Sequence, residues 1–200
     1  FTSPQDSNAS SSWWSYVGGV SWRHPEGPKS SIQGKDNYPV VHVAWEDAQA
    51  YATWAGRELP TEAQFELVAR SKRNSTFPWE GEELAPDGHH HANTWQGNFP
   101  IQNTGEDEHV GIAPVGCFKP NDFGVYDLIG NVWEWTTNWY APGHNPSDNS
   151  NPDGPAEDQS FDYANAGFPV KVIKGGSYLC APNYCMRYRP AARQAADTGL

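Results

Sequence analysis

The sequence predicts a mixed α and β protein in which much of the chain is coil. Its 200 residues include 10 Trp, 9 Tyr and 8 Phe together with 19 Gly and 17 Pro. This combination indicates a core of a few large side chains joined by many turns. Only two segments have helical periodicity, and two others have the β-branched content of strands. We expect one domain over residues 13–200, preceded by a flexible polar arm over residues 1–12.

The two expected helices are short and lie close together. Between Trp45 and about Ala55, apolar residues fall at positions i, i+3, i+4 and i+7, and Gly56 follows as a stop signal. A second helix is expected after Pro60, because Thr61 and Gln64 have the spacing of a capping box, and it should end near Arg70.

The two expected strands are VVHVAW at 40–45 and VKVIKGGSY at 170–178, which are rich in β-branched and aromatic residues. Residues 77–121 are too rich in Gly, Pro, Asn and Asp for a confident assignment. Residues 145–167 read as a long surface loop.

The formal net charge of −11 excludes some classes of function. Binding to nucleic acid or to an anionic membrane surface requires a basic surface, so we expect neither partner. The sequence has no apolar run long enough to span a membrane. The acidic excess is compatible with a solvated surface or with carboxylates that hold calcium.

Two segments carry oxygen ligands in a calcium-like pattern. Asn93 and Asp107 lie in HHHANTWQGNFPIQNTGEDEHVG, and Asp127 and Glu134 flank the turn of YDLIGNVWEW. Calcium takes six to eight oxygens from carboxylates, amides and backbone carbonyls. Capping and turn hydrogen bonds by Asn and Asp explain the same residues without a metal, so chemistry alone leaves both interpretations open.

Cys180 and Cys185 lie in KGGSYLCAPNYCMRYRPAAR, and the third cysteine is Cys117. The intervening Ala-Pro-Asn-Tyr favours a turn that brings the two sulfurs together. Three interpretations follow: a small disulfide, a soft-metal site suited to Cu(I), or a reactive thiol beside Arg187 and Arg189. The residues alone do not choose among them.

A family resemblance bears on this choice. GRELPTEAQFELVAR, ANTWQGNFPIQNTGED, NDFGVYDLIGNVWEWT and the cysteine segment, in this order, resemble the formylglycine-generating enzymes, also called sulfatase-modifying factors. The resemblance covers about residues 13–193, and the cysteine motif is its most specific part, because non-catalytic paralogues lack the pair. It implies a C-type-lectin-like α+β fold that is low in regular secondary structure.

The resemblance also implies an activity. Such enzymes use O2 to convert a cysteine in a Cys-x-Pro-x-Arg motif of an unfolded or nascent sulfatase into Cα-formylglycine. Cys180 and Cys185 would bind Cu(I), and the substrate thiol would join them as a ligand. Ser177 and Trp133 would line the pocket, Tyr184 would lie beside it, and Arg193 would face the peptide.

The same resemblance implies two calcium sites. The first would use the side chains of Asn93 and Asp107 with the carbonyls of Thr94 and His109. The second would use Asp127 and Glu134 with the carbonyls of Gly130 and Val132.

Some positions depart from the vertebrate pattern. The disulfides of vertebrate members match Ala52, Ala69 and Pro190 here, so those bridges cannot form. We therefore expect a bacterial-type, cytoplasmic monomer, with family segments missing at both ends of the chain.

The competing hypothesis is a calcium-dependent, non-catalytic binding module on the same scaffold. It predicts ligand binding that does not depend on either cysteine.

Overall fold

The computed structural model describes residues 13–73, 75–81, 85, 87–144, 152–165 and 167–199. The arm predicted at 1–12 lies outside these residues, as does much of the loop predicted at 145–167. The described elements follow the order α1 (Trp45–Trp54), α2 (Glu62–Ala69), β1 (Glu134–Trp139), β2 (Val170–Lys174) and β3 (Gln194–Asp197). Two 3-10 turns, η1 (Glu157–Gln159) and η2 (Tyr163–Asn165), lie between β1 and β2.

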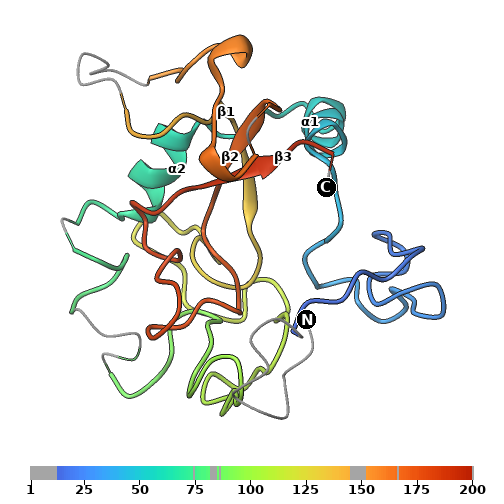
Figure 1. Ribbon diagram of the computed structural model, residues 1–200. Helices are drawn as coiled ribbons and strands as arrows, with labels where there is room; N and C mark the ends of the chain where they lie inside the picture. Colours follow the sequence, from blue (N-terminus) through green and yellow to red (C-terminus); the bar gives the residue numbers. More distant parts are fainter. Residues whose placement is uncertain are drawn as a thin grey trace.

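The sheet is antiparallel in the order β1-β2-β3, and the two helices flank it (Figure 1). Every residue of the central strand β2 is buried. β1 pairs Glu134 with Lys174 and Trp135 with Ile173, and its register shifts before Trp139. The C-terminal end of the sheet lies beside the start of α1, where the Trp45 amide donates to the Thr198 carbonyl at 3.0 Å.

The helices begin where the sequence signals predicted. The Thr61 hydroxyl accepts the Gln64 amide at 3.1 Å, and the Gln64 side chain accepts the Thr61 amide at 2.9 Å, so the capping box is confirmed. α2 packs Phe65 and Ala69 into the interior, against β1 and β2. α1 is fixed to β1 through its first residue, whose indole donates to the Thr136 carbonyl at 2.9 Å.

The prediction of a strand at 40–45 was wrong. This segment is coil up to Trp45, and His42 has a φ of 55°, which interrupts an extended run. The strand predicted at 170–178 ends at Lys174, because Gly175 and Gly176 have φ values of 86° and 76°. The sequence analysis did not predict β1 or β3.

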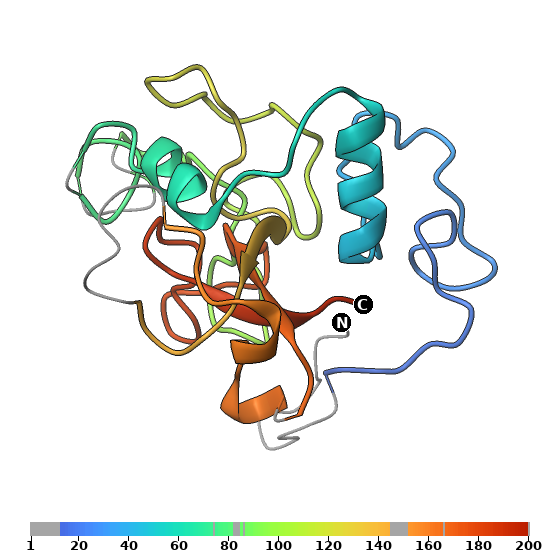
Figure 2. The same ribbon diagram turned by 90° about the horizontal axis from the view of Figure 1, so that it is seen from above.

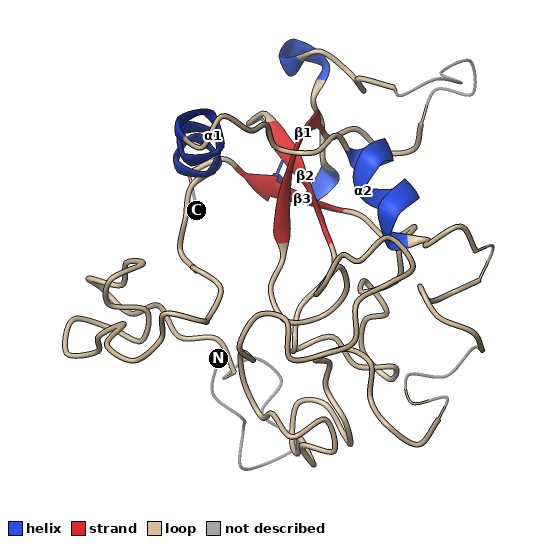
Figure 3. Cartoon of the chain, turned by 180° about the vertical axis from the view of Figure 1, so that it is seen from behind, coloured by secondary structure: helices blue, strands red, loops and turns tan. Residues whose placement is uncertain are grey.

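Helices and strands gather at one end of the molecule, and the other end is built from loops (Figure 3). Seen from above, α1 and α2 stand apart on either side of the sheet (Figure 2). Few helices and a small antiparallel sheet confirm the predicted α+β class. None of the helices in the described ranges has the length and apolar character needed to cross a membrane.

Candidate active site

The cysteine turn follows directly from the end of β2. Gly176 turns the chain so closely that a Cβ there would lie 2.8 Å from the Tyr188 amide nitrogen. The Cys180 amide then donates to the Ser177 carbonyl, and the Cys185 amide donates to the Ala181 carbonyl, both at 2.9 Å. These bonds bring the two sulfurs to 2.9 Å, and both thiols are free.

The two thiols differ in burial and in acidity. Cys180 is 2% exposed, and Cys185 is half-buried. The hydrogen bond from Cys180 is the largest cause that lowers the pKa of Cys185 to about 6, and the Arg187 charge also contributes. The same bond and burial raise the pKa of Cys180. At neutral pH the pair therefore contains one thiolate, at the more accessible position.

An apolar cluster encloses the pair. Its buried members are Phe77, Ala92, Ile129, Cys180 and Tyr188, with Trp79, Trp133 and Cys185 packed against them. Trp133 thus packs against the same cluster as the cysteines, and its role in lining a substrate pocket stays a prediction. The Ser177 side chain lies close enough to Cys180 to oppose, in part, the rise in the pKa of that thiol.

Tyr184 lies on the exposed side of the turn. Its ring stacks on Phe99 with centroids 4.2 Å apart and lies 5.9 Å from the ring of Trp13. The Tyr184 side chain is about half exposed. An aromatic surface therefore borders the more accessible of the two thiols.

Arg193 lies at the N-terminal end of α2, in contact with the first residue of that helix, Glu62. It is not part of the cluster around the cysteines. Its guanidinium contacts the Glu62 carboxylate at 2.8 and 2.9 Å and donates to the carbonyls of Ala141 and Gly143 at 2.8 and 3.0 Å. It also lies 4.5 Å from the centre of the Tyr140 ring. These contacts are those of a structural ion pair, and a role in substrate binding stays a prediction.

In the first predicted calcium loop, the backbones of Thr94 and His109 lie beside the Asp107 carboxylate. Asp107 accepts the Thr94 amide at 3.2 Å and the His109 amide at 2.9 Å. Asn93, Thr94 and Asp107 are all buried. The Asn93 Oδ1 atom has no hydrogen-bond partner within the described ranges, although its Nδ2 donates to the Gly111 carbonyl at 2.8 Å. A buried amide oxygen without a partner is costly unless a cation or water meets it.

The second predicted calcium loop is a tight turn. Asp127 and Gly130 have φ values of 57° and 76°, and a Cβ on Gly130 would lie 2.1 Å from the Asn93 carbonyl oxygen. Glu134 is the first residue of β1, on the other side of this turn. Desolvation raises the pKa of Glu134 to about 8, and the neighbouring negative charge of Asp127 adds to the shift. A bound divalent cation would relieve both effects.

Neither loop contains a cluster of three or more His, Cys, Asp or Glu side chains, and such clusters are absent from the described part of the chain as a whole. The first predicted ligand set has one carboxylate, Asp107, and the second has two, Asp127 and Glu134, so the remaining donors would be amide and backbone oxygens. The orphaned Asn93 oxygen and the desolvated Glu134 carboxyl group fit an oxygen-only cation such as calcium. The two free thiols fit a soft ion such as Cu(I).

Sequence reasoning missed three residues of this region. Tyr188 is fully buried beside the thiols, and burial raises its pKa to about 12. Gln96 donates its amide to the Thr94 carbonyl and to Asp107. Asn131 is 3% exposed and bonds to both loops. A buried Asn or Gln produces no periodic pattern in the sequence. The one local signal at Asn131 is its position after Gly130, because Gly-Asn is typical of a turn.

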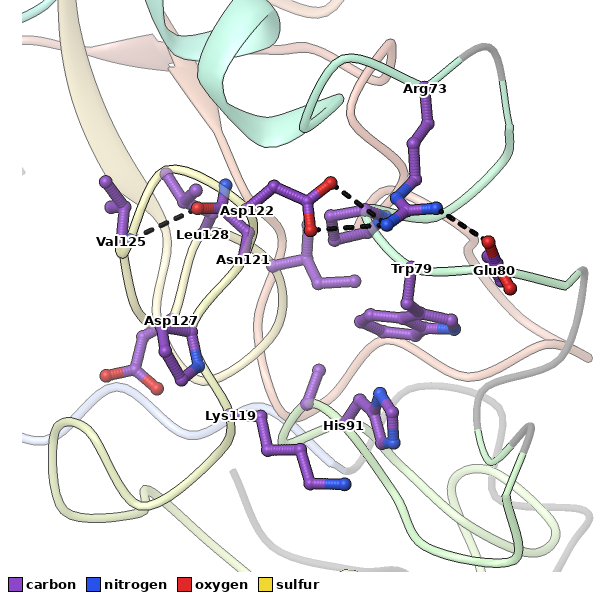
Figure 4. A pocket seen from close by; sticks show the side chains of 14 residues that line it. Arg73, Trp79, Glu80, His91, Lys119, Asn121, Asp122, Val125, Asp127 and Leu128 are labelled. Carbon is purple, nitrogen blue, oxygen red and sulfur yellow. Dashed lines mark hydrogen bonds and ion pairs between the residues drawn. The ribbon is translucent and has the colours of Figure 1, made fainter.

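A hollow of about 300 Å³ borders the apolar cluster without including either cysteine. Ala92 and Ile129, members of the cluster, form part of its wall. Arg73 is held at its rim by Asp122 at 2.9 Å and by Glu80 at 3.4 Å (Figure 4). The charge of Arg73 at this rim is therefore already paired with the carboxylates of Asp122 and Glu80.

The fold and the paired thiols define a class of protein related to sulfatase-modifying factors. The family described as "Sulfatase-modifying factor enzyme 1-like domain" matches residues 3–199, and the chain belongs to this family. The solved structure of PvdO from Pseudomonas aeruginosa matches with a TM-score of 0.58 and 28% identity, over 80% of this chain and 56% of that one. Treponema denticola variable protein 1 shares the fold, with a TM-score of 0.61 and 20% identity over 91% of this chain and 74% of that one.

The chain is similar to proteins named formylglycine-generating enzyme. It is 50% identical to that of Mus musculus over 92% of this chain and 47% of the relative. It is also 50% identical to that of Mycobacterium tuberculosis over 93% of this chain and 62% of the relative. The chain thus spans about half to three fifths of these relatives. A Mus musculus protein named inactive C-alpha-formylglycine-generating enzyme 2 is 47% identical over 84% of this chain and 46% of its own length, so identity alone does not indicate activity.

Proposed function

We propose that this protein converts a cysteine of a sulfatase polypeptide into Cα-formylglycine, with O2 as oxidant. The observation that carries the proposal is the pair of free thiols 2.9 Å apart, one buried and one accessible. Relatives of this chain that cover most of its length bear the name of that activity. The inactive relative shows why the proposal must rest on the thiols.

Cys180 and Cys185 would hold Cu(I), which would supply a site for O2 reduction and for binding of the substrate thiol. The lowered pKa keeps Cys185 ready as a thiolate ligand. Trp133 and the apolar cluster would exclude water from the buried thiol. The exposed ring of Tyr184, which stacks on the buried Phe99, would contact the peptide together with Trp13.

The substrate CH2–SH group loses two hydrogens to become a thioaldehyde, and water hydrolyses it to the aldehyde and hydrogen sulfide. O2 takes up those two hydrogens and two more from a thiol reductant, and becomes two molecules of water.

The test incubates the protein with Cu(I), O2, a thiol reductant and a Cys-x-Pro-x-Arg peptide, and mass spectrometry follows the thiol-to-aldehyde change. We expect turnover that is lost in Cys180→Ser and in Cys185→Ser. Cys117→Ser is the matched control, because Cys117 is exposed and its sulfur lies 3.7 Å from the His109 ring, away from the pair. Absence of aldehyde, or turnover that survives either substitution in the pair, contradicts the proposal.

We also propose that the two oxygen-rich loops bind calcium. The support is the orphaned Asn93 oxygen in one loop and the desolvated Glu134 carboxyl group beside Asp127 in the other. Calcium would act here as a structural ion, because it would fix the loops on which the cysteine turn rests. Isothermal titration calorimetry tests the assignment, and we expect binding that is lost when both Asp107→Asn and Glu134→Gln are present.

A further inference from the structure

Asn131 uses every polar group it has. Its amide donates to the Asn93 carbonyl at 2.8 Å, and its carbonyl accepts the Tyr178 amide at 2.9 Å. Its side-chain oxygen accepts Asn93 Nδ2 at 3.1 Å and the Ala113 amide at 2.9 Å. Its side-chain nitrogen donates to the Ala113 carbonyl at 3.1 Å. A single buried residue thus forms five hydrogen bonds.

These bonds join three segments that are distant in sequence. Asn131 itself lies in the second loop, between Gly130 and Val132. Asn93 belongs to the first loop, and Ala113 ends the stretch that carries Asp107. Tyr178 opens the cysteine turn, directly after Ser177. Asn131 therefore touches both candidate calcium loops and the segment that positions Cys180.

A second connection runs in parallel. The Trp95 amide, two residues after Asn93, donates to the Cys180 carbonyl at 3.0 Å. The first loop is therefore bonded directly to the buried cysteine, and through Asn131 it is also bonded to the beginning of the same turn. The first part of the cysteine turn, from Tyr178 to Cys180, is thus held by backbone that belongs to the loops or bonds to them.

The backbone conformation at position 131 also favours Asn or Gly over most other residues. Its φ is 58°, in the left-handed region, where Asn is tolerated and most side chains are strained. Asn131→Gly therefore removes the side-chain bonds without adding backbone strain, and the two main-chain bonds can persist. Asn131→Asp keeps both acceptor bonds but replaces the donor to Ala113 with a carboxylate oxygen that faces the Ala113 carbonyl.

We propose that Asn131 is a positioning residue that couples cation binding in the two oxygen-rich loops to the burial of Cys180. An ion bound in either loop restrains Asn93 or the Gly130–Val132 turn. Because Asn131 is hydrogen-bonded to Asn93 and to Tyr178, this restraint also limits the motion of the cysteine turn. The proposal rests on the calcium sites of the proposed function, but not on the oxidation chemistry. Coupling between sites joined by such networks commonly amounts to roughly 5–150-fold.

The test measures alkylation of Cys180 by iodoacetamide in a Cys117→Ser, Cys185→Ser background, where Cys180 is the single thiol. We expect calcium to slow alkylation by roughly tenfold relative to EGTA. In Asn131→Gly the calcium response should be clearly smaller but should not vanish, because the main-chain bonds of residue 131 to Asn93 and Tyr178 and the bond from Trp95 to Cys180 remain. Asn131→Asp should respond more strongly to calcium than Asn131→Gly, because it keeps the two acceptor bonds, and a general loss of stability would not explain that order.

Asn138→Ala is the matched control, because Asn138 is 4% exposed and hydrogen-bonded but lies in β1, at the sheet end of the molecule. It should keep the calcium response of the Cys117→Ser, Cys185→Ser chain. A response below about twofold in that chain, an undiminished response in Asn131→Gly, or an equal loss in Asn138→Ala would overturn the proposal.

A second measurement needs no variant at position 131. Hydrogen exchange of the Tyr178 and Trp95 amides, which donate to Asn131 and Cys180, should slow in calcium, while the Glu62 amide at the start of α2 should not change. Equal effects at all three amides would contradict the coupling. If the calcium response is present but the unaltered chain does not convert the peptide, the result counts against the proposed oxidation alone.

Discussion

At the sheet end of the molecule, buried charges are neutralised by other side chains. Glu62 is 6% exposed and pairs with Arg193, while the fully buried Lys174 lies 3.4 Å from Glu66. At the loop end, Asp107 is bonded by neutral amides, and Asp127 raises the pKa of its fellow carboxyl group Glu134. At the sheet end the buried charges have side-chain partners of opposite sign. At the loop end the carboxylates lie beside neutral amides or another carboxylate. This difference supports the proposal that the loop end binds a cation.

Breaking the ion pair at the sheet end should have the largest effect. Arg193→Met leaves the Glu62 carboxylate buried without its bidentate partner, so the free energy of unfolding should fall by about 3 kcal/mol. Urea unfolding measures the change. Arg57→Met, at an exposed position, should change it by less than about 0.5 kcal/mol. A loss below about 1 kcal/mol for Arg193→Met would show that the pair is not structural.

Calcium should stabilise only the loop end. At about 100 times the dissociation constant, we expect each occupied site to contribute about 2.7 kcal/mol, which raises the melting temperature by roughly 5–10 °C. Scanning calorimetry with calcium and with EGTA checks this. Glu134→Gln should reduce the gain, because the second loop loses a carboxylate ligand, and Glu58→Gln at an exposed position should keep it. Equal gains in both variants would count against the second site.

The capping box at the sheet end should contribute a smaller amount. Thr61→Ala removes the acceptor of the Gln64 amide, and the free energy of unfolding should fall by about 1 kcal/mol. Thr53→Ala, on the exposed side of α1, should cost less than about 0.5 kcal/mol. The same urea titration compares the two variants, and equal costs would refute a specific capping role.

Lys171 should give the smallest effect, as a dependence on pH. Burial lowers its pKa from 10.5 to about 8, although the rings of Trp139 and Trp45, 3.7 and 4.1 Å away, favour the charged form. Between pH 8 and 10.5 the unfolded chain then binds more protons than the folded chain, so the free energy of unfolding rises with pH. We expect a rise of about 1 kcal/mol or less, because the rings and nearby solvent reduce the shift.

Lys171→Met should remove this rise, and urea unfolding at several pH values from 7 to 10 measures it. The matched comparison is Lys119→Met, because Lys119 is exposed and paired with Asp87 at the loop end. If both variants keep the slope of the unaltered chain, Lys171 is not its source.

Much of the candidate site could be predicted from the sequence, because its signals are local. The capping box at Thr61, the two helices and the turn between Cys180 and Cys185 depend on residues a few positions apart. The strand predicted at 40–45 was wrong for the same reason. β-branched content is a local signal, and it does not indicate whether a partner strand lies alongside. β3 has only Gln, Ala, Ala and Asp, and it is a strand because β2 pairs with it.

The sequence by itself determined the helices, the central strand, the proximity of the two thiols and the positions of the oxygen-rich loops. The tertiary structure alone decided that Cys185 rather than Cys180 is the acidic thiol, because burial and a directed hydrogen bond set the two pKa values. It also decided that Arg193 pairs with Glu62 and that Asn131 joins three distant segments. Such contacts depend on the packing of residues far apart in the chain, which no local pattern encodes.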